Sequence, residues 1–136
     1  MVNEAILRDK LAEPIDVTVA DGTGIAKGEL LKLTDPRTAE KSDGIGDTIA
    51  GIAAREKVAS DGRTRLAVFT KGIFDMVASG VITVGSPVVS GIDSEDNTVA
   101  TGQTAVPPHS GASVIGYALE TSTNHETVQV MLNIGA

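Results

Sequence analysis

The stretch Thr127-Val-Gln-Val-Met-Leu132 (TVQVML) has an aliphatic residue at every second position, which places Val128, Val130 and Leu132 on one face of an extended chain. Such alternation is typical of a strand with one buried face. Toward the N-terminus, segments rich in turn residues separate further short apolar runs: Ile15–Ala20, Leu30–Leu33, Ile49–Ala54, Arg65–Thr70, Val81–Val84, Pro87–Ser90 and Val114–Leu119. Many short strands at close spacing predict a mainly β fold, either a small barrel or a sandwich.

Two kinds of connection are predicted between these runs. Asp61-Gly62 is a strong signal for a β-hairpin between Ile49–Ala54 and Arg65–Thr70. By contrast, 34–48 and 93–113 are predicted to be long polar loops, because turn residues and prolines dominate them. Loops this long in a compact domain are often functional or become ordered on binding.

The chain also repeats itself, with the features kept in order while the loops differ. Two pairs of stretches carry the repeat: Ile25–Gly28 with Ile82–Gly85, and Ala50–Ala53 plus Arg65–Gly72 with Ile115–Ala118 plus Val128–Gly135. The matched glycines, Gly28 with Gly85 and Gly51 with Gly116, are 57 and 65 residues apart. We interpret this as one barrel or sandwich domain, 17–136, with pseudo-two-fold halves at about 17–80 and 81–136. Chance similarity among strands rich in Gly, Ala and Val is the alternative.

The N-terminal segment has a different pattern. Asn3 can cap a helix and Leu7 and Leu11 are spaced i, i+4, so Asn3–Glu13 is predicted to be either a short helix or an extended arm that ends at Pro14. Our hypothesis is that residues 1–16 are an arm that orders on a neighbouring subunit, with Ile6, Leu7 and Leu11 as its apolar contacts. A helix packed on its own barrel is the alternative.

Composition limits what the chain can do. It has no Trp, one Tyr and two Phe among 136 residues, so its core must be aliphatic and its contacts broad and shallow, because aromatic anchors usually dominate tight binding sites. With no Cys, disulfides, thiolate nucleophiles and cysteine-ligated metals are excluded. No apolar run reaches the length of a membrane span and Met1–Lys10 lacks the apolar stretch of a signal peptide, so we expect a soluble protein made in a cytoplasm.

Charge is unevenly distributed. All 11 Lys and Arg residues lie at or before Lys71 together with 12 acids, whereas 72–136 carry six acids and no cation. A net charge of −7 repels phosphate and argues against nucleic-acid binding. Either this is ordinary solubilising charge, or the acidic half faces solvent while the mixed-charge half meets a partner.

Motifs that would carry chemistry fail on inspection. Gly22-Thr-Gly24 suggests a nucleotide fingerprint, but Lys27 stands where its third glycine belongs. Asp93–Asn97 opens like a calcium loop but lacks the central glycine and the closing acid. His109 and His125 have no zinc-motif spacing and are predicted to lie at the surface. The sequence therefore predicts no catalytic, cofactor or metal residue, and a protein that is not an enzyme.

Four stretches in a shared order resemble a family of bacteriophage head-decoration, or capsid cement, proteins. They are Gly28–Leu33, Ile49–Ala53 with its hairpin, Leu66–Phe74, and Val84–Val89 with Val114–Leu119 and Val128–Leu132. The resemblance implies a small β-barrel protein of the virion that binds the outer capsid surface and braces major capsid subunits, often as a homotrimer. It implies no catalytic residues. The N-terminal extension and the 34–48 loop depart from shorter members, which leaves the docking mode open.

The predicted contacts with the major capsid protein, or between copies of the chain, come from the arm and the two loops: Ile6, Leu7, Leu11, Arg37, Lys41, Pro107 and Pro108. Other structural roles, in a tail, baseplate or head fibre, are the main alternative. A small hydrolase using Asp93 or Asp96 and a polysaccharide-binding β module rank below it, since the first lacks a site motif and the second an aromatic platform.

Overall fold

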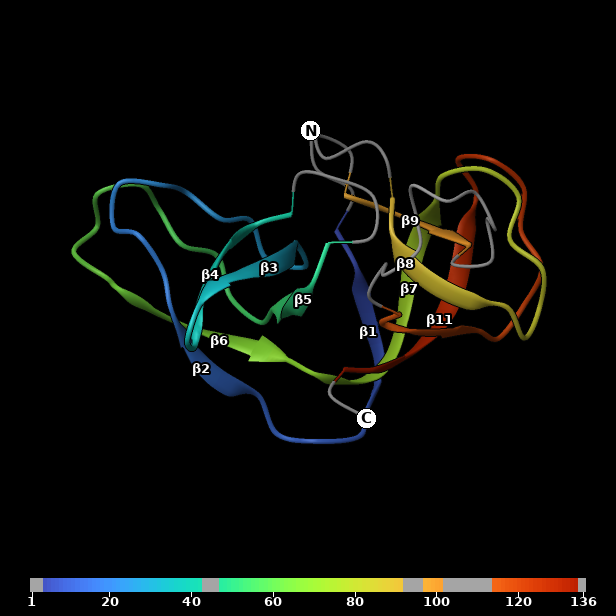
Figure 1. The fold of residues 1–136 in the computed structure, drawn as a ribbon, viewed down its shortest axis with the longest axis horizontal. Helices are drawn as coiled ribbons and strands as arrows, with labels where there is room; N and C mark the ends of the chain where they lie inside the picture. The colour runs from blue at the N-terminus through green and yellow to red at the C-terminus, as the bar shows by residue number, and fades with distance from the viewer. Residues whose placement is uncertain (1–3, 43–46, 92–96, 102–113, 135–136) are drawn as a thin grey trace.

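The computed structural model describes residues 4–42, 47–91, 97–101 and 114–134, and every regular element in them is a β-strand (Figure 1). The strands are β1 (Ile6–Lys10), β2 (Ile15–Thr18), β3 (Leu30–Asp35), β4 (Thr38–Lys41), β5 (Ile49–Ala53), β6 (Arg65–Phe69), β7 (Lys71–Ala78), β8 (Pro87–Ser90), β9 (Thr98–Thr101), β10 (Gly116–Ala118) and β11 (Thr127–Asn133). The prediction of a mainly β fold is confirmed.

Strands β2 to β6 close on themselves as barrel one, in the order β2-β4-β3-β5-β6. Strands β7 to β11 form barrel two in the matching order β7-β9-β8-β10-β11. Each barrel closes through one parallel pairing, β2 with β4 and β7 with β9, while the other neighbours within each barrel are antiparallel. The two barrels lie side by side (Figure 1). The structure thus has two closed barrels that divide near Thr70, because β7 belongs to barrel two. The prediction was one barrel or sandwich with halves at about 17–80 and 81–136.

The two barrels make equivalent backbone hydrogen bonds at matched residues of the repeat. The N–H of Gly28 donates to Ala53 O and that of Gly85 to Ala118 O, both over 2.8 Å. Both glycines have a φ of 82°, a left-handed conformation that side chains disfavour. Isolated bridges join Ile25 to Lys57 and Ile82 to Ser122. The predicted repeat matched Arg65–Gly72 with Val128–Gly135, which is one residue out of register. Val68 lies opposite Ala53 and Val130 lies opposite Ala118, so Val68 corresponds to Val130.

The N-terminal segment is a strand over Ile6–Lys10, so the helical alternative for Asn3–Glu13 is wrong there. β1 pairs antiparallel with the first half of β7, from Gly72 to Asp75, and β9 takes the same edge of β7 further along. About three helical turns are marginal alone, and the open edge of β7 offers hydrogen bonds that a helix would leave unused.

Both predicted long loops contain strands. β4 lies within 34–48 and β9 within 93–113, whereas Val81–Val84, predicted as a strand, contributes only the bridge at Ile82. The sequence of β4 looks polar because only one of its four side chains, that of Ala39, is buried. These pairings depend on partners distant in sequence, which local composition does not reveal.

The core has two clusters, and the larger one includes residues of both barrels. The interior of barrel one is a cluster that includes Val17, Leu31 and Leu66. The larger cluster holds the interior of barrel two, but it also takes in Leu30, Ile49 and Ile52 of barrel one. These three side chains therefore point out of barrel one and are buried by barrel two.

Candidate interaction surfaces

The predicted arm contacts Ile6, Leu7 and Leu11 lie on β1 or just after it, and we call them the β1 surface. They are 43, 36 and 55% exposed. Arg8 Nε donates to Asp75 Oδ2 over 2.5 Å, which ties β1 to β7. The β1 surface is thus a set of three exposed apolar side chains on or just after a strand that is paired with β7.

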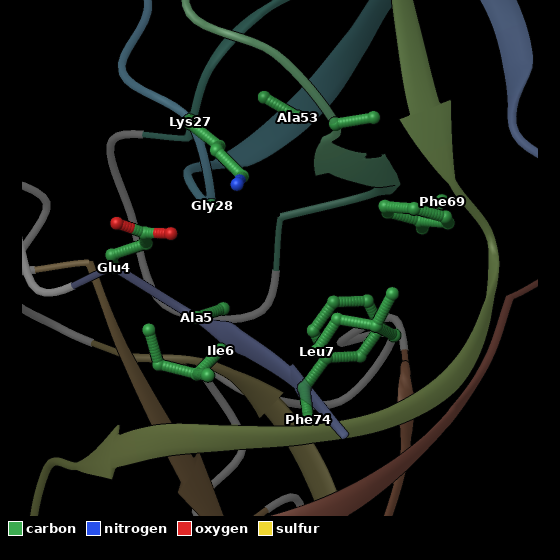
Figure 2. Close-up of a pocket in the computed structure, with 10 residues that line it drawn as sticks. Glu4, Ala5, Ile6, Leu7, Lys27, Gly28, Ala53, Phe69 and Phe74 are labelled. Carbon is green, nitrogen blue, oxygen red and sulfur yellow. The ribbon is translucent and has the colours of Figure 1, made fainter. Parts of the chain in front are cut away.

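Behind β1 lies a cavity of about 260 Å³ between the two barrels. Figure 2 shows Ala5, Ile6 and Leu7 on one side and Lys27, Gly28 and Ala53 on the other. Phe69 of barrel one and Phe74 of barrel two meet here with ring centroids 5.8 Å apart. Packing residues surround the cavity, and Ala5 N, just before β1, donates to Gly28 O over 3.1 Å, so the cavity is a seam between the barrels.

Arg37 marks a second exposed surface, at one end of barrel one. It lies in the β3–β4 turn with a φ of 51° and donates through Nη2 to Asp16 O over 3.0 Å. A groove of about 420 Å³ beside it is lined by Ile15, Val17, Leu33, Arg37, Ile49, Ala50, Thr70 and Ile134. We call it the end groove. Its exposed apolar side chains, Ile15 and Leu33, were not predicted as contacts.

A third surface lies on barrel two. It consists of Pro87 on β8, Tyr117 on β10, Met131 on β11 and Val114 just before β10. A shallow cavity of about 380 Å³ lies over part of it. Tyr117 Oη lies 3.2 Å from Met131 Sδ. We call these four residues the open face of barrel two. It carries Tyr117, the chain's one tyrosine.

Of the remaining predicted contact residues, Lys41 alone lies in the described part of the chain. Lys41 ends β4 and pairs with the buried Glu29, Nζ to Oε2 at 3.3 Å, so its charge is partly committed inside the molecule. Pro107 and Pro108 lie outside the described residues. Of the predicted set, Ile6, Leu7 and Leu11 lie on β1 or just after it, whereas Arg37 lies on the end groove.

Asn97 is a structural residue that the sequence reasoning missed, since it was read as part of a failed calcium loop. Its Oδ1 accepts from Leu30 N over 2.8 Å, and its Nδ2 donates to Gly28 O over 2.7 Å. It is buried, and its φ is 54°. An Asn before a short apolar run was the available signal, because Asn tolerates this left-handed conformation. Its role is to join barrel two to barrel one.

Lys57 shows how the far end of barrel one is held. Its side chain is fully buried, and Nζ donates to Asp21 O over 2.8 Å, to Val58 O over 3.2 Å and to Asp61 Oδ1 over 3.1 Å. One ammonium group thus satisfies the carbonyls of two turns that approach each other. Its equivalent in barrel two is the smaller Ser122.

Two carboxylates have lowered pKa values, and both stabilise turns. Hydrogen bonding from Arg63 N, with Lys57 and Val58 N adding to it, lowers the pKa of Asp61 below its ordinary value of 3.8. The hydroxyl and backbone N–H of Thr123 lower the pKa of Glu126 below 4.5. These two turns are the equivalent hairpin connections of the barrels, so the shifts reflect architecture rather than catalysis.

The described residues offer little for chemistry. No group of three or more His, Cys, Asp or Glu in them could hold a metal ion. His125 is exposed in a turn, as predicted, while His109, Asp93 and Asp96 lie outside the described part of the chain. Within the described ranges, no helix has the length and apolarity needed to cross a bilayer. The arrangement supports contacts between surfaces.

Comparisons with known proteins agree with this picture. The model of a family described as phage cement protein matches residues 11–134. A search of curated proteins finds no match. Among solved structures, the chain is similar to the N base of head fibre gp8.5 in bacteriophage phi29, with a TM-score of 0.55 and 16% identity, covering 88% of this chain and 92% of that chain. At that identity the likeness concerns the fold.

Proposed function

The chain belongs to the family of phage cement proteins, and from that premise we propose that it binds the outer surface of an assembled capsid and stabilises contacts between major capsid subunits. That it is a structural protein of a phage virion follows from the family. The observation that supports the finer proposal is the β1 surface, three exposed apolar side chains on or just after a strand that is paired with β7.

We assign the capsid contact to Ile6, Leu7 and Leu11 with their charged neighbours Arg8 and Lys10. These apolar side chains gain by leaving water, and the neighbouring charges can fix the register of docking. β1 also keeps a free backbone edge, since in its sheet it pairs with β7 alone among the described strands. A strand of a capsid subunit could pair with that edge.

Binding to the assembled lattice but not to free subunits stabilises the lattice by RT ln(1 + [L]/Kd). At a hundredfold excess over Kd this is about 2.7 kcal/mol per site. Because a capsid repeats the site many times, modest contacts of this kind suffice. If the chain is a homotrimer, as the resemblance predicts, avidity strengthens them further.

The test is co-sedimentation with expanded heads of the phage that encodes the chain. Leu11→Asp and Ile6→Asp place charge on the β1 surface, and head binding should fall at least tenfold. Because Ile6 also lines the cavity behind β1, each variant needs a melting curve to verify folding. Val58→Asp is the matched control, because Val58 is 59% exposed and lies on the far turn of barrel one. If both β1-surface variants sediment like the control, the assignment of the capsid contact is wrong.

A second candidate is a head fibre anchor, which the fold likeness to the phi29 head fibre base favours. In that case the chain would hold a fibre on the head, as part of a longer protein or by binding one. Electron microscopy of decorated heads separates the two, since a cement protein adds a compact density at many sites and an anchor adds a projecting one.

A further inference from the structure

The contact between the two barrels joins two faces, and each of these faces has an equivalent on the other barrel. Strand pairing defines which residues correspond: Leu30 opposite Ile52 matches Pro87 opposite Tyr117, and Ile52 opposite Phe69 matches Tyr117 opposite Met131. Ile49 and Val114 each stand two residues before the matched glycines. The outward face of barrel one and the open face of barrel two are therefore equivalent, apolar at all four positions.

The two equivalent faces differ in what covers them. In barrel one, Leu30, Ile49 and Ile52 are at most 2% exposed, because barrel two packs on them. In barrel two, Val114 and Tyr117 are 53 and 44% exposed. Barrel two thus presents to solvent a copy of the face on which a barrel docks within the chain.

The opposite side of the contact repeats as well. Barrel two reaches barrel one through Phe74, whose ring meets Phe69, through Asn97, and through Ser90, whose Oγ accepts from Asp47 N over 3.0 Å. The strand registers match Phe74 to Ile15, Asn97 to Arg37 and Ser90 to Leu33 of barrel one. All three equivalents are exposed, and they line the end groove together.

We propose that a second copy of the chain docks head to tail, with the end groove of its barrel one against the open face of barrel two of the first. This contact would repeat between chains the one that joins the barrels within a chain. Being heterologous, it generates either a closed ring or an open filament. The inference stands on the repeat, and it can fail while capsid binding holds.

Charge favours this pairing over a symmetric one. Residues 1–71 carry 11 cations and 12 acids, whereas 72–136 carry six acids and no cation. A contact between two copies of barrel two would bring together two halves of net charge −6, while the head-to-tail contact brings this acidic half to a half of net charge −1. Like charges oppose the symmetric arrangement more strongly than the head-to-tail one.

The experiment is light scattering on the purified full chain, without heads, over a concentration series. Wild type is expected to run at a multiple of its 13.9 kDa mass. Tyr117→Asp and Leu33→Asp, each with a melting curve to verify folding, should be monomers. Val81→Asp is the control, since Val81 is 62% exposed and lies on neither surface.

Mixing the two monomeric variants decides the geometry. A Leu33→Asp chain keeps its open face and a Tyr117→Asp chain keeps its end groove, so a head-to-tail contact predicts a heterodimer and nothing larger. A monomeric wild type, a wild-type oligomer that survives both substitutions, or the absence of the heterodimer would each overturn the proposal. So would loss of head binding in both variants with a monomeric wild type, which would assign these surfaces to the capsid.

Discussion

Arg37 and Asn97 occupy the same position in two copies of one barrel. Each follows the first strand of a β-hairpin, and each has a left-handed backbone, with φ values of 51° and 54°. Asn97 turns its amide into the seam between the barrels, whereas Arg37 holds its guanidinium at an exposed groove. One turn thus serves the internal contact, and its equivalent remains available for an external one.

Replacing Asn97 tests the internal contact. Asn97→Ala removes both hydrogen bonds and leaves Leu30 N and Gly28 O buried without that partner, which should lower the free energy of unfolding by about 2–4 kcal/mol. Asn97→Gly also removes the amide but fits the left-handed backbone, so it separates strain from the lost bonds. Urea unfolding measures both. A loss below 1 kcal/mol in the glycine variant would show that the amide does not join the barrels.

The matched glycines Gly51 and Gly116 should each resist substitution. A Cβ on Gly51 would lie 2.6 Å from Phe69 O, and one on Gly116 would overlap Met131 O, so neither strand pair could close around it. Gly51→Ala and Gly116→Ala should each cost about 1–3 kcal/mol or more by thermal unfolding. Gly22→Ala is the control, since nothing lies within 4 Å of its Cβ position. Equal melting temperatures for all three variants would contradict the close strand approach.

How far the sequence predicts this fold depends on how local the signal is. β11 and β8 could be predicted because their alternation or composition is strong over a few residues. β4 and β9 could not, since each is a short, mostly polar or small-residue strand that exists through pairing with a distant partner. β7 was not among the predicted strands, because it begins within the stretch Leu66–Phe74, two residues after β6 ends, with no run of turn residues between them.

Lys57 should be required for the far end of barrel one. Lys57→Met keeps the length of the side chain but removes the ammonium that oxygens of Asp21, Val58 and Asp61 share, so the turns at Asp21 and Asp61 lose their common donor. The expected loss is about 2–4 kcal/mol of unfolding free energy. The exposed Lys27→Met serves as the control. A Lys57→Met protein as stable as the control would show that the buried ammonium is dispensable.

Acid should destabilise the chain through its two turn carboxylates. The folded pKa values of Asp61 and Glu126 lie below 3.8 and 4.5, so their contribution to stability is present above those values and is lost as pH falls through the lowered pKa. Asp61→Asn with Glu126→Gln should be less stable than wild type at pH 7 and should lose less stability between pH 5 and 2. Unfolding curves across that range check this, and parallel curves for the two proteins would refute it.

The candidate surfaces were only partly accessible to sequence reasoning. The β1 surface was predicted because Ile6, Leu7 and Leu11 are apolar residues in a polar segment outside the barrel pattern. Ile15, Leu33 and Tyr117 were not, since an exposed apolar residue in a strand looks like a buried one until the barrel fixes its direction. Their significance depends on comparing the two barrels position by position.

The central claim, that the chain stabilises an assembled capsid, is tested most directly by heating expanded heads with and without saturating protein and measuring the temperature at which they release DNA. The account predicts a higher release temperature that rises with protein concentration, and no such shift with Leu11→Asp. Saturated heads that release DNA at the temperature of bare heads would contradict it.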